Sequence, residues 1–172
     1  RQAQDFLDAS LNRLGDPFLL PDMDKAVAEV RRALAAGDKI AVYGDYDVDG
    51  VTGAALLMQY LRSQGADCVY YIPDRLSEGY GLNQAAVRRL AEEGCKLMIT
   101  VDSGITAVEE IEYAASLGMN VVVTDHHECM DRLPPALAVV NPRRPDSPYP
   151  FRELAGVGVA FKLVCALERN RP

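Results

Sequence analysis

The sequence predicts an α/β fold: an open, mostly parallel β-sheet flanked by helices on both faces. Two observations lead to this class. From residue 39 onward, segments of strand character alternate with segments of helical periodicity, which is the order that βαβ units produce. The expected strands are also continuous apolar runs, such as Val121-Val122-Val123, and this is typical of strands that are buried on both faces.

Two segments of helical pattern open the chain. Residues 1–14 and residues 22–36 each place apolar side chains at helical spacing, and Gly37 is expected to end the second helix. We therefore expect an N-terminal helical segment over residues 1–38 and a catalytic core over residues 39–172.

The core is expected to contain five strands. They are the short apolar runs at residues 39–43, 68–72, 96–101, 120–124 and 138–140. Four helices are expected between and after them, at residues 49–64, 83–93, 106–117 and 156–169. Asn83 is a suitable N-cap residue, Gly118 a suitable helix stop, and the proline-rich stretch 141–150 a loop.

Composition and charge limit the class of protein. Hydrophobic residues make up 49% and charged residues 25%, which is ordinary for a globular domain. The apolar runs are too short to cross a bilayer, so a soluble protein with no membrane partner is expected. The net charge of −7 argues against a mainly basic nucleic-acid surface, unless the acidic residues hold cations that invert the local field.

The four cysteines are too far apart for a paired-cysteine zinc or redox motif. We expect free thiols in a reducing compartment, and hence a bacterial cytoplasm. The chain opens with Arg1, and we expect it to be a fragment or a processed chain.

Polar residues follow three of the expected strands. The first strand leads into Gly44-Asp45-Tyr46-Asp47-Val48-Asp49-Gly50, the third into Asp102-Ser103-Gly104, and the fourth into Asp125-His126-His127-Glu128, which holds the only two histidines of the chain. Ligands of open parallel sheets bind just beyond the carboxyl ends of the strands. We therefore expect these side chains to lie together in one site.

Clustered carboxylates raise the pKa of one another unless a cation compensates their charge. Carboxylate oxygens suit hard cations such as Mg²⁺ and Mn²⁺, and an added imidazole shifts the preference toward Mn²⁺. The sequence therefore predicts one or two divalent ions, Mn²⁺ or Mg²⁺.

Each motif also has a simpler interpretation. The spacing of Asp45, Asp47 and Asp49 resembles the start of a calcium loop, but the twelfth position is Leu56 rather than glutamate and the loop follows a strand, so that interpretation fails. The three aspartates remain open to being turn residues, with Asp49 as a helix N-cap, and Asp102-Ser103-Gly104 to being an ordinary turn. Adjacent histidines on an extended chain point to opposite sides, so one of them is expected to bind metal and the other substrate.

Two further segments are candidates for substrate binding. The loop 77–83 leads into a helix N-terminus, with Arg75 as a candidate phosphate contact and Tyr80 as a candidate base-stacking ring; a surface turn explains this loop equally well. Gly156 and Gly158 open the last helix, where they are suited either to anion binding or to close packing.

Four motifs in this order resemble the DHH phosphoesterase family: the aspartate triplet Asp45/Asp47/Asp49, the stretch Glu78-Gly79-Tyr80-Gly81-Leu82-Asn83, Asp102-Ser103-Gly104 and Asp125-His126-His127. The segment from Tyr43 to Gly50, the Glu78 stretch and Leu154-Ala-Gly-Val-Gly-Val-Ala-Phe161 are similar to the branch of single-strand DNA exonucleases.

The resemblance implies a 5′-to-3′ exonuclease on single-stranded DNA, dependent on Mn²⁺ or Mg²⁺, that acts in DNA repair and recombination. It implies metal ligation by Asp47, Asp49, Asp102 and His126. Asp45 is a further candidate ligand, because Tyr43 stands where relatives often have a metal-binding histidine. Asp125 is either a ligand or the partner that orients the histidines.

The implied catalytic residues are Asp102, His126 and His127, with His127 at the scissile phosphate. The candidate substrate contacts are His127, Arg75, Tyr80, Ser103, Gly156 and Gly158. The partners implied are single-stranded DNA with a 5′ end, a single-strand-binding protein and a helicase.

The chain departs from the family pattern in two ways. It lacks the further metal-binding aspartate that relatives carry downstream of the last helix, and it lacks their second domain with a Gly-Gly-His motif. Two alternatives stay open: a small-phosphate enzyme of the same family, such as an oligonucleotide or cyclic-dinucleotide phosphodiesterase or a pyrophosphatase, and a non-catalytic replication scaffold.

Overall fold

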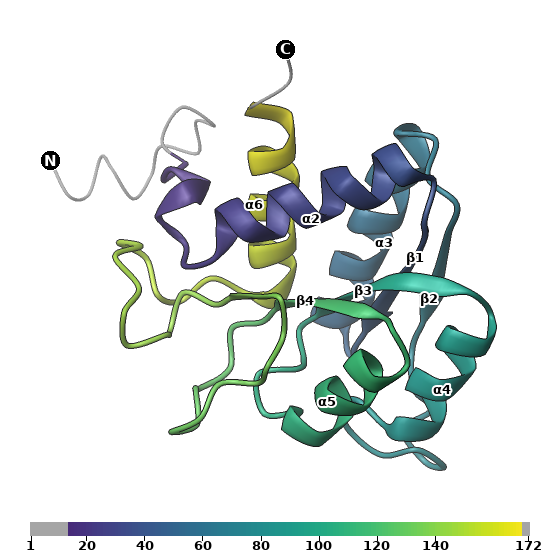
Figure 1. The fold of residues 1–172 in the computed structure, drawn as a ribbon. Helices are drawn as coiled ribbons and strands as arrows, with labels where there is room; N and C mark the ends of the chain where they lie inside the picture. Colours follow the sequence, from purple (N-terminus) through teal and green to yellow (C-terminus); the bar gives the residue numbers. More distant parts are fainter. Residues whose placement is uncertain (1–13, 170–172) are drawn as a thin grey trace, which may run out of the picture.

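The computed structural model describes residues 14–169 and contains one parallel sheet (Figure 1). Within these residues the strands are β1 (Lys39–Gly44), β2 (Cys68–Tyr71), β3 (Cys95–Val101), β4 (Asn120–Thr124) and β5 (Ala138–Val140). Their order across the sheet is β2-β1-β3-β4-β5, and every pair of neighbours is parallel. The predicted fold class and all five predicted strands are confirmed.

Helices cover both faces of the sheet. They are η2 (Pro17–Leu19), α2 (Met23–Ala36), α3 (Val48–Ser63), α4 (Gln84–Glu92), α5 (Val108–Ser116) and α6 (Gly156–Arg169). α2, α3 and α6 lie on one face, and α4 and α5 lie on the other (Figure 1). The helix predicted over residues 1–14 lies outside the described residues. Between residues 14 and 169 there is no helix with the length and apolar character that a membrane crossing requires.

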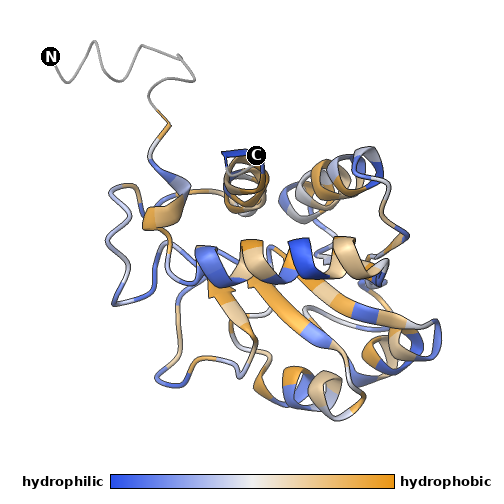
Figure 2. Cartoon of the chain, turned by 45° about the horizontal axis from the view of Figure 1, so that its top comes forward, coloured by the Kyte–Doolittle hydropathy of each residue, from blue (hydrophilic) through white to orange (hydrophobic). Residues whose placement is uncertain are grey.

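Both faces of each central strand are buried, which explains the continuous apolar runs. Ile40 and Val42 of β1 pack toward α2, α3 and α6, whereas Ala41 and Tyr43 pack toward α4 and α5. Figure 2 shows the strands coloured hydrophobic along most of their length, between the two helical layers. α2 also contributes to this core, because Met23 is fully buried in the first cluster.

Most local signals in the sequence act as predicted. The Asn83 side chain accepts a hydrogen bond from the Ala86 N–H at 2.8 Å and caps α4, and Gly37 ends α2 with a φ of 68°. The N-cap of α3 is Asp47 and not Asp49, which corrects the simpler interpretation of that aspartate. The cysteines Cys68, Cys95, Cys129 and Cys165 are free thiols, as expected.

The hydrogen-bond ladder continues one residue past the carboxyl ends of the strands. The Asp45 N–H donates to Val101 O at 3.3 Å, the Asp102 N–H to Thr124 O at 3.0 Å, and the Asp125 N–H to Val140 O at 3.1 Å. These bonds hold Asp45, Asp102 and Asp125 side by side across three neighbouring strands. The same pairing that builds the sheet therefore aligns the three aspartates.

Candidate metal centre

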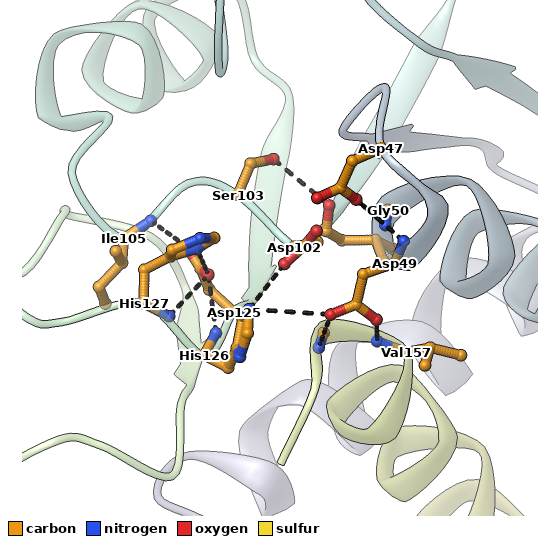
Figure 3. A network of polar contacts seen from close by, with 12 residues as sticks. Asp47, Asp49, Gly50, Asp102, Ser103, Ile105, Asp125, His126, His127 and Val157 are labelled. Carbon is orange, nitrogen blue, oxygen red and sulfur yellow. Dashed lines mark hydrogen bonds and ion pairs between the residues drawn. The ribbon is translucent and has the colours of Figure 1, made fainter. Parts of the chain in front are cut away.

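Carboxylates and imidazoles from three loops gather at the carboxyl edge of the sheet (Figure 3). Asp45, Asp47 and Asp102 each offer an oxygen, and these atoms lie within 4.8 Å of one another. Asp102, His126 and His127 form a second group under the same limit, so Asp102 belongs to both. The three strand ends meet, as the sequence predicted.

Asp102 lies at the centre of the cluster and is 1% exposed. Its φ of 60° lies in the left-handed region, which costs a non-glycine residue about 1–3 kcal/mol. His126 Nε2 lies 3.0 Å from Asp102 Oδ1, but this oxygen lacks a well-directed hydrogen bond. Burial, together with the charges of Asp49 and Asp47, raises the pKa of the Asp102 carboxyl to about 8.

Asp45 and Asp47 differ in how their charge is compensated. Asp45 is 3% exposed, its Oδ1 has no hydrogen-bond partner, and burial raises the pKa of its carboxyl. Asp47 accepts from the N–H groups of Gly50 and Asp49, both at 2.9 Å, and the bond from Gly50 helps to hold its pKa below the usual value. Gly50 is needed here, because a Cβ would lie 2.6 Å from the Asp45 backbone nitrogen.

Asp49 joins the cluster to the start of α6. Its two oxygens accept from the N–H groups of Gly156 at 2.6 Å and Val157 at 2.7 Å. Its Oδ2 lies 3.8 Å from His126 Nε2, so the same carboxylate faces the site (Figure 3). The helix N-terminus that the sequence offered to a substrate anion is thus occupied by a carboxylate of the chain itself.

The two glycines of α6 differ in their surroundings. A Cβ on Gly156 would lie 2.5 Å from Asp102 Oδ1, whereas a Cβ on Gly158 would meet only Leu154, at 3.4 Å. For Gly156 this geometry favours close packing, the alternative that the sequence left open. A Cβ added at Gly158 would contact neither the acidic cluster nor the histidines.

Asp125 is fully buried and accepts several hydrogen bonds. Its Oδ2 accepts from the Ile105 N–H at 2.9 Å, and its Oδ1 accepts from the His126 N–H at 2.7 Å, the His127 N–H at 3.1 Å and His127 Nδ1 at 2.7 Å. Burial acts to raise the pKa of Asp125, but these bonds hold it below its usual value. The sequence left two roles open for Asp125, metal ligand or partner that orients the histidines. This geometry favours the orienting role.

The two histidines are directed differently. His126 turns its Nε2 toward Asp102 and Asp49, into the acidic cluster. His127 bonds to Asp125 through Nδ1, which raises the pKa of the imidazole, and its Nε2 lies 3.4 Å from the Tyr80 hydroxyl. One imidazole therefore faces the carboxylates, and the other lies at the border of the cluster.

A hollow of about 290 Å³ lies beside His127. Its lining includes Tyr80, Leu82, Ile105, Thr106, Glu110 and His127. Tyr80 is 57% exposed, and its ring meets His127 and Tyr46 edge to face, at centroid distances of 6.2 and 6.3 Å. The Arg75 guanidinium lies 5.3 Å from the centre of the Tyr46 ring. Arg75 and Tyr80, named as substrate candidates from the sequence, thus lie in one row that leads to His127.

One further candidate for substrate binding, Ser103, is buried. Ser103 is 2% exposed, its Oγ lies 3.4 Å from Val101 O, and its side chain points toward Asp47 of the acidic cluster (Figure 3). Sequence reasoning did not select Tyr46, or Asn141, which is fully buried directly after β5 and donates to His127 O at 2.9 Å. Asn141 could have been selected by the criterion that selected the aspartates, because it is a polar residue directly after a strand. For Tyr46 there was no signal beyond its place between two aspartates.

The fold and the cluster define a class: an α/β protein whose parallel strands deliver carboxylates and an imidazole in the arrangement that holds divalent cations. The chain belongs to the DHH family, because the sequence profile described as the N-terminal domain of that family matches residues 39–172.

Curated relatives carry the name single-stranded-DNA-specific exonuclease RecJ. The Bacillus subtilis protein is 49% identical over 157 residues, which cover 91% of this chain and 20% of that protein. The Escherichia coli protein is 44% identical over 149 residues, which cover 86% of this chain and 26% of that protein. The chain thus spans about a fifth to a quarter of the length of these relatives.

Two solved structures are also similar. A crystal structure of exonuclease RecJ bound to manganese matches with a TM-score of 0.80 at 42% identity, covering 89% of this chain and 39% of that one. RecJ from Thermus thermophilus in complex with Mn²⁺ matches with a TM-score of 0.74 at 37% identity, covering 87% of this chain and 21% of that one.

Proposed function

We propose that this chain is the catalytic part of a metal-dependent phosphodiesterase, a 5′-to-3′ exonuclease that degrades single-stranded DNA to mononucleotides in DNA repair and recombination. The observation that carries the proposal is the buried Asp102, which is shared by two groups of potential metal ligands. The names of the similar proteins support the choice of substrate. In this proposal residues 39–172 are the catalytic core of a longer protein whose second domain helps to hold the DNA.

The residues present fit one or two divalent ions, Mn²⁺ or Mg²⁺. Oδ1 of Asp45 and Oδ1 of Asp102 are buried without a hydrogen-bond partner, and a nearby cation would compensate both. Asp45, Asp47 and Asp102 would hold one ion. Asp49, Asp102 and His126 would hold the other, with Asp49 also bound to the start of α6.

Bound divalent ions supply an activated water and stabilise the charge that develops on the phosphate. His127 would contact the scissile phosphate through Nε2, since its Nδ1 is engaged by Asp125. The raised pKa of His127 favours the protonated imidazole, which can donate to a phosphate oxygen. Asp125 acts through His127, by fixing the direction of the ring.

The hollow beside His127 would receive the terminal nucleotide. Its size suits a single nucleotide, and the exposed ring of Tyr80 offers a stacking surface for the base. Arg75 would contact a phosphate of the strand. Since the similar proteins are bacterial, we place the protein in the bacterial cytoplasm. We also propose a single-strand-binding protein and a helicase as partners.

The test pairs calorimetric titration with Mn²⁺ and an assay for mononucleotide release from 5′-phosphorylated single-stranded DNA, for the chain and for Asp102→Asn. We expect Mn²⁺ binding that the variant loses, and in the complete enzyme loss of the Mn²⁺-dependent cleavage. Cleavage of small phosphates alone would indicate a small-phosphate enzyme. Absence of Mn²⁺ binding would indicate a scaffold.

A further inference from the structure

An apolar groove of about 420 Å³ lies between α3 and the edge strand β2. Its walls include Val51, Ala54, Ala55 and Met58 of α3, and Tyr70 and Ile72 at β2. Tyr70 is 65% exposed and Val51 is 44% exposed, although both are large apolar side chains. None of these residues belongs to the acidic cluster.

The peptide groups of β2 are open beside this groove. The Ile40 N–H donates to Asp67 O at 2.9 Å and Ile40 stands opposite Cys68, so the peptide groups of residues 67, 69 and 71 face β1. Those of Cys68 and Tyr70 face outward, and within residues 14–169 they have no backbone partner. The strand Cys-Val-Tyr-Tyr is only 4 residues long, which limits the open edge, but it carries no charge and no proline, two further devices that protect an exposed edge.

The opposite edge of the sheet is closed by side chains. At β5, the Val139 N–H donates to Asp22 Oδ2 at 3.3 Å, and Arg144 Nη1 donates to Val139 O at 2.8 Å. The fold thus closes one edge with dedicated polar groups and leaves the other open next to an apolar groove. This difference makes the β2 edge a candidate surface for a pairing strand.

We propose that the groove and the β2 edge form a docking surface for the polypeptide that follows α6 in a longer protein. The segment would pair in extended conformation with the Cys68 and Tyr70 peptide groups and place an apolar side chain in the groove. This inference rests on the part of the proposed function that makes the chain a piece of a longer protein; the similar proteins, of which it spans 20% and 26%, support that length.

The position of α6 favours an occupant from the same polypeptide. The Tyr60 hydroxyl donates to Glu168 Oε1 at 2.9 Å, so the last turn of α6 lies beside the last turn of α3. Packed helices are separated by about 8–10 Å, so a chain that continues from α6 starts about one helix from the groove. A short tether of this kind gives an effective concentration in the millimolar range, far above that of a free partner. Arg62, the charged residue of the lining, favours a segment with an acidic group at that end.

The test is amide hydrogen exchange at Tyr70, in this chain and in the natural longer protein. We expect exchange at Tyr70 at least about 100-fold slower in the longer protein, because a pairing strand protects that N–H. Ala55→Arg, which fills the groove from an exposed position on α3, should remove the protection in the longer protein. Leu117→Arg is the matched control, since Leu117 is 38% exposed and does not line the groove, and it should leave the protection intact.

Equal exchange at Tyr70 in both proteins would overturn the proposal, as would a natural chain that ends at Pro172. Sedimentation equilibrium addresses the other occupant: a dimer of this chain that Ala55→Arg dissociates would identify a second copy and overturn the proposal as well. Hydrogen exchange does not depend on catalysis. An inactive protein with a protected Tyr70 therefore contradicts the proposed exonuclease alone, and an active one with an open edge contradicts the docking alone.

Discussion

Among single residues, Asp102 combines several energetically unfavourable features of the site. It combines a buried carboxyl, a φ of 60° and two neighbouring carboxylates, and its pKa is raised to about 8. A protonated Asp102 differs from asparagine by little in shape and nothing in charge. Asp102→Asn should therefore fold with equal or higher thermal stability without metal at pH 8, and should lose the stabilisation by Mn²⁺. Scanning calorimetry with and without Mn²⁺ measures both, and a variant that unfolds without metal would contradict this account.

The same pKa sets the sign of a pH effect. Because the folded-state pKa of Asp102 lies above that of the unfolded chain, the folded metal-free protein binds more protons between about pH 4 and pH 8. The contribution of the Asp102 carboxyl to stability is fully present below about pH 4 and is lost as the pH rises toward about 8. A bound cation requires the deprotonated carboxylate, so the increase in melting temperature caused by Mn²⁺ should be larger at pH 8 than at pH 6.

The matched control for this effect is Asp102→Asn, in which the dependence on pH should shrink because the titrating carboxyl is absent. An equal response to Mn²⁺ at both pH values in the unmodified chain would mean that another group sets the protonation of the site.

Asp125 offers a test of how one residue acts through another. Its carboxylate holds His127 Nδ1 at 2.7 Å, and asparagine at this position leaves one oxygen for four donors. Asp125→Asn should lower the maximal rate of the complete enzyme by about 10–100-fold, as for residues that orient a metal-site imidazole. It should also lower the pKa of His127, which NMR titration measures. An unchanged His127 titration would rule out the orienting role.

At the scale of elements, the start of α6 is built into the site. Gly156 donates to Asp49, and a Cβ there would lie 2.5 Å from Asp102 Oδ1. Gly156→Ala should therefore lower the free energy of unfolding by about 1–3 kcal/mol and weaken Mn²⁺ binding. Gly158→Ala, two residues further on, is the matched control: its Cβ has ordinary contact distances, and it should raise stability by about 0.5–1 kcal/mol. Urea unfolding of the two variants decides, and similar effects would contradict the packing argument.

The elements themselves were predictable because their signals are local. Apolar runs marked the strands, and Asn83 and Gly37 marked helix ends through bonds within four residues of themselves. The gathering of three strand ends was also predictable, since parallel strands share a carboxyl edge. The contact of Asp49 with Gly156 was not, because it joins residues 107 positions apart and depends on the packing of α6 against α3.

Across the whole molecule, stability depends on how the edges of the sheet are closed. Arg144 is 8% exposed and closes the β5 edge by bonding to Val139 O, Asp22 and Asp146 at the same time. Through Asp22, which precedes α2, it joins that helix to the far edge of the sheet. A single guanidinium thus connects α2 to β5, the last strand of the described residues and one edge of the sheet.

Replacing this guanidinium should weaken the entire fold. Arg144→Leu removes the side-chain donor to Val139 O and one partner of the Asp22 carboxylate, which keeps the Val139 N–H and Lys25, and should lower the free energy of unfolding by about 1–3 kcal/mol. Arg132→Leu is the control, because the Arg132–Glu112 pair is largely exposed and should contribute less than about 1 kcal/mol. Both are measured by urea unfolding, with equal slopes required for the comparison. If the two variants lost the same stability, the β5 edge would not depend on Arg144, and the contrast with the open β2 edge would lose its physical basis.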